Sequence, residues 1–196
     1  MILKLFQTGE IALRQFARPL GRDEILSAPV QELIVAMRDT MRDAPGVGLA
    51  APQVGMPLQI AVIEDSQEYI DKLPPGQAAQ RARVPVPFHA IVNPTLTVEE
   101  ESPVHFFEGC LSIAGFTAIV PRALKVRVDC LNERAEAMTI RAEGWYARIL
   151  QHEIDHLHGR LYIDRMESRS FMTVDNFNRH WRTTPVEEFW RATRHG

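Results

Sequence analysis

Cysteine is scarce in this sequence, with only Cys110 and Cys130 among 196 residues. Two cysteines cannot build a disulfide framework, so we expect a reducing, cytoplasmic setting. Long apolar runs are also missing, because stretches such as 33–37 and 60–63 are far shorter than the roughly 20 residues that span a bilayer. These absences exclude a disulfide-rich secreted scaffold and a membrane-spanning protein.

A charge excess is absent too, since 22 Lys and Arg residues face 25 Asp and Glu residues, and the net charge is −3. Nucleic-acid binders usually carry a basic excess, so we expect no nucleic-acid partner. The first residues show neither a signal peptide nor an Arg-rich transit segment. What the sequence does have is 45% apolar and 24% charged residues, which is typical of a globular domain.

Hydrophobic periodicity predicts an α+β fold in which mostly antiparallel strands pack around a central helix. The expected helices cover 27–43 and 145–158, and a capping-box sequence at 184–187 begins a short C-terminal helix. The expected strands cover 59–64, 91–99, 123–130 and 137–141, with a proline-rich loop over 71–87. We divide the chain into a main domain, residues 1–167, and a C-terminal tail, residues 168–196.

The predicted central helix contains the sequence Gln151-His152-Glu153-Ile154-Asp155-His156. His152 and His156 are four residues apart, so they share one helix face and both imidazoles can meet one metal ion. Glu153 follows the first histidine directly, where its carboxylate can reach a water at such a site without binding the metal. This H-E-x-x-H pattern on an apolar helix favours a metallohydrolase over surface histidines that match by chance.

A third ligand is needed, and a zinc endopeptidase is the alternative interpretation. The residues after His156 mimic the longer peptidase pattern H-E-x-x-H-x-x-G-x-x-H, but Tyr162 occupies the position of its last histidine. His158 lies two residues beyond His156 and faces away from it, as expected of a histidine at a helix end. The third ligand must therefore come from elsewhere in the chain.

Cys110, within Glu108-Gly109-Cys110-Leu111-Ser112, is the candidate third ligand. It would complete a Cys-His-His set with the fourth position open for water, which is the arrangement of catalytic metal sites. Cys130 instead falls on the inward face of an alternating strand, so we expect it in the core. The small-residue loop from Gly46 to Gln53 suggests backbone lying close to a ligand, and the Gln53 amide can donate to an oxyanion.

Together these segments resemble the peptide deformylases, metalloenzymes that remove the formyl group from the initiator methionine of new chains. The family motifs G-x-G-L-A-A-x-Q, E-G-C-L-S and Q-H-E-x-D-H-L stand in order at 46–53, 108–112 and 151–157. The resemblance covers about residues 5–170, which makes the main domain a deformylase catalytic domain. Residues 144–150 and 162–166 are more similar to the mitochondrial-type branch. The missing transit segment favours a bacterial member of that branch over a mitochondrial or plastid one.

The resemblance implies a role for each matching position. The implied metal ligands are Cys110, His152 and His156. The implied catalytic groups are Glu153 as general base and acid, with the Gln53 side chain and the Leu111 backbone N–H as oxyanion donors. The implied substrate-binding residues are Val47, Gly48, Phe106, Gly109, Trp145 and Ile149, of which Val47, Phe106, Trp145 and Ile149 would line a methionine pocket.

The resemblance also implies one divalent metal ion, natively Fe2+, for which Zn2+, Ni2+ or Co2+ can substitute. The implied partners are formyl-methionyl nascent peptides near the ribosome exit, with no membrane and no nucleic acid required. The oligomeric state, monomer or homodimer, stays open. A zinc endopeptidase remains the alternative, whereas a non-catalytic binding module is disfavoured because Glu153 and Gln53 are both present.

Overall fold

The computed structural model describes residues 1–194, so residues 195 and 196 of the predicted tail lie outside the described residues. The helices are α1 (Arg22–Ile25), α2 (Ala28–Asp43), α3 (Gln67–Asp71), α4 (Gln77–Gln80), α5 (Gly144–Leu157), α6 (Val174–His180) and α7 (Val186–Arg194). The strands are β1 (Gly48–Ala50), β2 (Ile60–Asp65), β3 (Val86–Glu108), β4 (Phe116–Leu131), β5 (Ala137–Glu143) and β6 (Met172–Thr173). Four short 3-10 turns complete the chain at Ile11–Arg14, Ala51–Val54, Tyr162–Asp164 and Ser168–Ser170.

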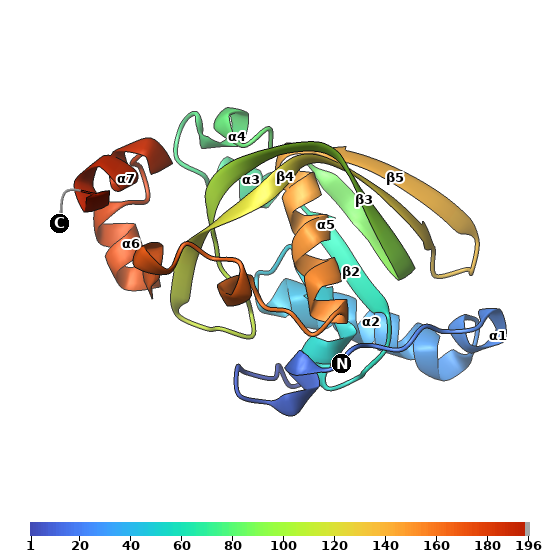
Figure 1. Ribbon diagram of the computed structural model, residues 1–196. Coiled ribbons are helices and arrows are strands. Elements are labelled where there is room, and N and C mark those ends of the chain that lie inside the picture. The colour runs from blue at the N-terminus through green and yellow to red at the C-terminus, as the bar shows by residue number, and fades with distance from the viewer. Residues whose placement is uncertain (195–196) are drawn as a thin grey trace.

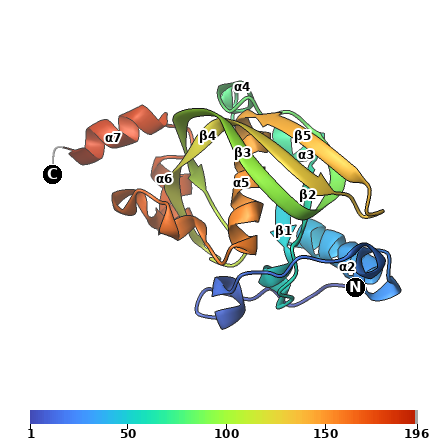
Figure 2. The ribbon, with the colours of Figure 1, turned by 45° about the vertical axis from the view of Figure 1, so that its right-hand side comes forward.

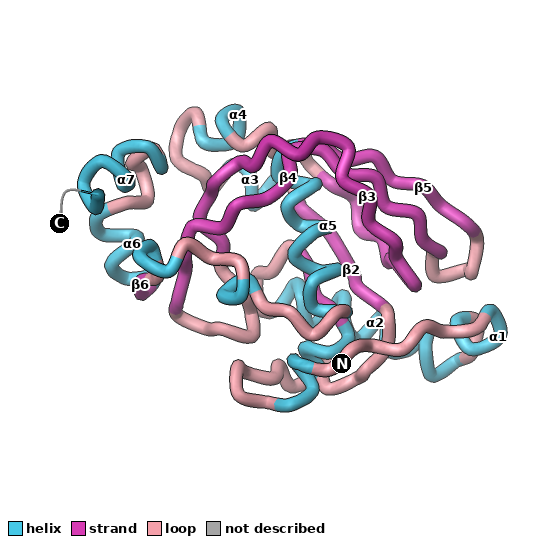
Figure 3. The backbone as a smooth tube through the Cα atoms, in the orientation of Figure 1, coloured by secondary structure: helices cyan, strands magenta, loops and turns pink. Residues whose placement is uncertain are grey.

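A curved antiparallel sheet surrounds the central helix α5 (Figure 1, Figure 3). The strands follow the order β1-β2-β3-β4-β5, and β6 pairs with β4 at its beginning. β3 and β4 form the longest pairing, which runs from Val92 opposite Leu131 to Glu108 opposite Ala118. The α+β class predicted from the sequence is therefore confirmed.

The predicted strands 91–99 and 123–130 are too short, because β3 and β4 extend well beyond them. Pro94 and Pro103 both fall where the β3–β4 register shifts, and β-bulges tolerate proline, so neither residue ends the strand. Asn93 at the first shift has a φ of 51°. Its side-chain amide exchanges hydrogen bonds of 2.8 and 2.9 Å with the backbone of Leu20. The Asn93 side chain at this register shift thus connects the N-terminal segment to the sheet.

The other predicted elements lie close to their expected positions. The helices predicted over 27–43 and 145–158 and the strands over 59–64 and 137–141 are confirmed to within two residues at each end. The predicted loop over 71–87 is partly wrong, because it contains the one-turn helix α4 and the first residues of β3. A helix of four residues is too short to produce a periodic apolar pattern.

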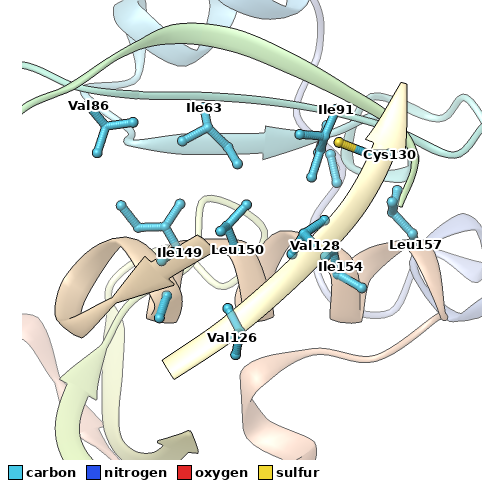
Figure 4. Packing of buried hydrophobic residues seen from close by; sticks show 14 of the residues in the cluster. Ile63, Val86, Ile91, Val126, Val128, Cys130, Ile149, Leu150, Ile154 and Leu157 are labelled. Atoms are coloured by element: carbon cyan, nitrogen blue, oxygen red, sulfur yellow. The ribbon is translucent and has the colours of Figure 1, made fainter. Parts of the chain in front are cut away.

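The main core lies between the inner face of the sheet and α5. Figure 4 shows Leu150 and Leu157 of α5 facing Ile63 and Ile91 of the sheet, with Cys130 beside them. Cys130 is 7% exposed, so its predicted place in the core is confirmed. A second cluster packs α2 against the opposite face of β2, which explains why residues 60–63 of β2 are all apolar.

The tail packs against the far half of β3 and β4, on the side away from α1 and α2 (Figure 2). Phe189 and Val186 of α7 are buried against Phe107 and Ile119. Within residues 1–194, no helix combines the length and apolar character needed to cross a membrane.

Candidate active site

The three predicted metal ligands converge although they come from two separate parts of the chain. α5 carries His152 and His156, and Cys110 lies in the loop that follows β3. Their ligand atoms all lie within 4.8 Å of one another, and Cys110 Sγ is 3.3 Å from His156 Nε2. A thiolate and two imidazoles are a suitable donor set for a divalent transition metal. These residues therefore fit the ion that the sequence predicts.

The two histidines are held in different ways. His152 Nδ1 lies 2.9 Å from a carboxylate oxygen of Glu108, which leaves Nε2 available for a metal. Such a carboxylate partner fixes the tautomer and the ring orientation of a metal-binding histidine. His156 is 1% exposed, and burial holds its pKa well below the ordinary value, with the charge of His152 acting in the same direction. The neutral imidazole is the form that binds a metal.

Glu108 joins the site to a network of buried charges. It accepts hydrogen bonds of 3.0 Å from both Nε and Nη2 of Arg122, and one of 2.6 Å from Arg148. Burial opposes the ionisation of Glu108, but the charge of Arg122 and the hydrogen bonds hold its pKa well below the ordinary value. Asp155 extends the network, because it pairs with Arg122 and Arg165. Sequence reasoning missed this network, although Glu108 stands in the E-G-C-L-S motif and Asp155 in the Q-H-E-x-D-H-L motif.

Glu153 is buried against the glycine loop. It is 4% exposed, and a Cβ placed on Gly48 would lie 2.6 Å from Glu153 Cδ. Burial raises the pKa of Glu153 to about 7, and the charge of His152 acts in the opposite direction. Oε2 of Glu153 has no hydrogen-bond partner among the described residues. This oxygen is therefore available to exchange a proton with a ligand in the site.

Gln53 points its amide group toward Cys110. Its Oε1 accepts a hydrogen bond of 2.9 Å from the Ala50 backbone, which fixes the orientation of the amide. Its Nε2 then lies 3.2 Å from Ser112 Oγ and 3.5 Å from Cys110 Sγ. Leu111 follows the cysteine, and its carbonyl accepts a hydrogen bond of 2.9 Å from Gln7. Both predicted oxyanion donors thus lie beside a predicted metal ligand.

A cavity of about 610 Å³ opens over these groups. The predicted site residues that line it are Val47, Gly48, Gln53, Gly109, Cys110, Leu111, Trp145, Ile149, His152 and Glu153. Phe106 lines a separate cavity of about 50 Å³ and contacts Trp145, with ring centroids 6.4 Å apart. The structure therefore does not place Phe106 in the wall of the main cavity, because Trp145 contributes that part of the wall.

The indole of Trp145 is packed among guanidinium groups. Those of Arg81, Arg83 and Arg148 lie 4.9, 5.2 and 5.9 Å from its ring centroids, within the range of cation–π contacts. Arg83 is itself held by Asp65, with hydrogen bonds of 2.7 and 2.8 Å. Sequence reasoning missed Arg81 and Arg83, because both lie in the segment interpreted as a surface loop.

A second cavity, of about 680 Å³, is lined by residues of β3, β4 and α5 and of the segment that follows α5, including His158, Arg122, Asp155 and Arg165. The last three side chains are paired with one another. His158 follows α5 directly and lies 5.5 Å from the ring of Phe16, which agrees with its predicted place at a helix end. The predicted metal ligands do not line this cavity.

A Cys-His-His set on an H-E-x-x-H helix, with a buried glutamate beside it, defines the class of the site as that of a metallohydrolase. The family model for polypeptide deformylase matches residues 2–171, and the chain belongs to this family. The resemblance seen in the sequence motifs is therefore confirmed.

Two curated relatives and one solved structure illustrate the similarity. The chain is 44% identical to the chloroplastic peptide deformylase 1A of Solanum lycopersicum over 89% of its own length and 63% of that protein. It is 42% identical to the mitochondrial peptide deformylase of Homo sapiens over 86% of its own length and 69% of that protein. The Acinetobacter baumannii class I type b peptide deformylase with Met-Ala-Ser bound superposes with a TM-score of 0.75 at 30% identity. That match covers 85% of this chain and 99% of the other.

Proposed function

We propose that this chain is a peptide deformylase, which hydrolyses the N-formyl group of the initiator methionine of nascent polypeptides and releases formate. The observation that carries the proposal is the convergence of the Cys110, His152 and His156 ligand atoms within 4.8 Å. Cys110 and His152 line one cavity together with Glu153 and Gln53. Membership of the deformylase family supports the same conclusion.

Cys110, His152 and His156 would hold one divalent ion, for which we propose Fe2+ as the native metal and Zn2+, Ni2+ or Co2+ as substitutes. When bound, such an ion supplies Lewis acidity toward water and the formyl carbonyl. One thiolate and two neutral imidazoles leave a divalent ion with a net positive charge. The donor set therefore preserves that acidity.

Three groups of the chain would carry the proton transfers and the charge. Glu153 takes a proton from the attacking water and returns it to the nitrogen of the methionine as the C–N bond of the formamide breaks. Gln53 Nε2 and the Leu111 backbone N–H donate hydrogen bonds to the oxygen of the formyl group as it becomes negative. The products are formate and a free methionine amine.

The methionine side chain would lie against Val47, Trp145 and Ile149, which line the cavity. Gly48 and Gly109 would offer main-chain hydrogen bonds to the peptide. We propose that Phe106 acts indirectly by holding Trp145 in position, because the two rings are in contact. A narrow space beside the ligands would admit a formyl group and exclude the larger acyl groups of internal peptide bonds.

The test is metal analysis of anaerobically purified protein, combined with formate release from formyl-Met-Ala-Ser. Removal of the formyl group from this peptide yields Met-Ala-Ser. The peptide is suitable because Met-Ala-Ser is bound in the related Acinetobacter baumannii structure. We expect about one metal ion per chain, formate release, and no cleavage of unformylated Ala-Ser-containing peptides. Peptide-bond cleavage without formate release would instead support the zinc endopeptidase alternative.

We further propose that the enzyme acts on nascent chains near the ribosome exit in a bacterial cytoplasm. The two cysteines are free, as a reducing compartment requires. Relatives are named for chloroplast and mitochondrion as well as for bacteria. Fractionation of source cells would test the compartment.

A further inference from the structure

The small cavity beside Phe106 is separate from the main cavity and has a lining of one charge sign. Two guanidinium groups, those of Arg81 and Arg148, line it, and its lining contains no carboxylate. The cavity measures about 50 Å³, whereas one buried water needs roughly 10–15 Å³ of such space. A cavity with cationic and no anionic side chains favours a negatively charged occupant of a few atoms.

Close packing of two backbone segments places Arg81 at this cavity. A Cβ on Gly144, the first residue of α5, would lie 2.8 Å from the Arg81 carbonyl oxygen and 2.6 Å from the Cβ of Ala82. Gly144 also has a φ of 63°, a conformation that favours glycine. The segment after α4 therefore lies directly against the start of α5. The Arg81 guanidinium then lies 4.9 Å from the ring centroid of Trp145 and 5.7 Å from that of Phe106.

Arg81 differs from the neighbouring arginines because it has no carboxylate partner. Arg83 pairs with Asp65, with hydrogen bonds of 2.7 and 2.8 Å, and Arg148 pairs with Glu108. Within residues 1–194, Arg81 forms no ion pair, and its buried Nε has no hydrogen-bond partner. An unpartnered buried N–H is energetically costly. This donor therefore requires an acceptor that the described side chains do not supply.

The charges around Arg81 are positive. Burial lowers the pKa of Arg81 to about 10, and the charges of Arg83 and Arg148 act in the same direction. The guanidinium is still protonated at pH 7, so it carries a charge without a counter-charge. A bound anion would supply the counter-charge and accept the hydrogen bond from Nε. A water molecule would accept the hydrogen bond but leave the charge uncompensated.

We propose that the cavity between Arg81 and Arg148 binds one small monovalent anion, with Arg81 Nε as a hydrogen-bond donor. The chemical class is a halide or a carboxylate of the size of formate, because about 50 Å³ excludes larger organic anions. Chloride would come from the medium, whereas formate is the product of the proposed reaction. The bound anion would hold the Arg81 guanidinium against Trp145, which forms part of the wall of the main cavity.

The direct test is diffraction from crystals of the full chain soaked in bromide or in formate. Bromide scatters anomalously, so we expect an anomalous peak in the small cavity within hydrogen-bond distance of Arg81 Nε. Formate in the second arm should give planar density at the same place. Binding of bromide alone would identify a halide site, and binding of formate alone would identify a carboxylate site. Density for water only in both arms would overturn the proposal.

Unfolding in denaturant measures the same binding in solution. Potassium chloride or potassium formate replaces potassium gluconate at constant ionic strength, since gluconate is too large for the cavity. For a dissociation constant of roughly 10 mM, an anion concentration of about 150 mM should lower the unfolding equilibrium constant about 16-fold. Arg81→Met keeps an unbranched apolar chain over Trp145 but removes the charge and the donor. This variant should lose both the anion dependence and the bromide peak.

The matched control is Arg179→Met, because Arg179 is exposed on α6 and lines none of the three cavities. It should keep the anion dependence of the wild type. Equal stability of the wild type in chloride, formate and gluconate would overturn the proposal, as would an undiminished anion dependence in Arg81→Met. Neither measurement uses formate release, so a failure of the proposed function would be recognised separately.

Discussion

Replacing Gly48 with alanine probes the contact between the glycine loop and Glu153. A Cβ at this position would lie 2.6 Å from Cδ and 2.8 Å from Cγ of Glu153, and closer still to Oε1. Gly48 is not among the glycines with positive φ, so alanine fits the backbone conformation. The main-chain N–H and C=O also stay in place. The perturbation is therefore a steric displacement of the Glu153 carboxylate.

The size of the overlap gives the expected effect. Carbon atoms rarely approach within about 3.4 Å, so the carboxylate must move by about 1 Å or β1 must shift. A misplacement of about 1 Å can cost roughly 10²-fold in rate, and overpacking costs about 1–3 kcal/mol of stability. We expect Gly48→Ala to lower kcat about 100-fold while the protein still folds.

The assay is formate release with saturating formyl-Met-Ala-Ser, accompanied by thermal unfolding and metal analysis. Gly21→Ala is the control, because no atom lies within 4 Å of its added Cβ and its φ is not positive. The same Gly48→Ala change is also measured in a Glu153→Ala background. There it should cost less than about threefold, because the group that it displaces is already absent.

Two results would refute the reasoning. One is a Gly48→Ala enzyme whose kcat stays within about threefold of wild type. The other is a full 100-fold loss in the Glu153→Ala background as well, which would place the damage at Gly48 itself or in β1.

Four further substitutions test the site and its surroundings. Glu153→Gln should retain metal but lower formate release by about 10²–10⁴-fold, since an amide cannot accept the proton; near-normal turnover would contradict its role. Cys110→Ser should lower the metal content per chain, whereas Cys130→Ser in the core should lower Tm without loss of metal; equal metal in both would disprove the ligand assignment. Glu108→Gln should destabilise the fold by about 3 kcal/mol, because Arg122 and Arg148 lose their buried counter-charge. It should also weaken metal binding by about 10–100-fold through His152, and unchanged denaturant midpoints and metal affinity would refute both effects.

The sequence alone determined those features that depend on local spacing. His152 and His156 share a helix face because they are four residues apart, and the apolar positions around them already placed that helix in the core. Alternation predicted that Cys130 is buried, which the structure confirms. The three ordered motifs identified the family, because their residues and order are more specific than any single motif.

Only the tertiary structure decided which distant residues meet. Glu108 pairs with Arg122 and Arg148, and no local period links three positions that lie 14 and 40 residues apart. The length of β3 depends on bulges that accommodate prolines, which the partner strand makes possible. Val174 of α6 lines the main cavity because β6 pairs with β4 across 56 residues of intervening chain. Such contacts form by packing and strand pairing between segments that are far apart in the chain. Their energy depends on both segments, so neither segment alone predicts the contact.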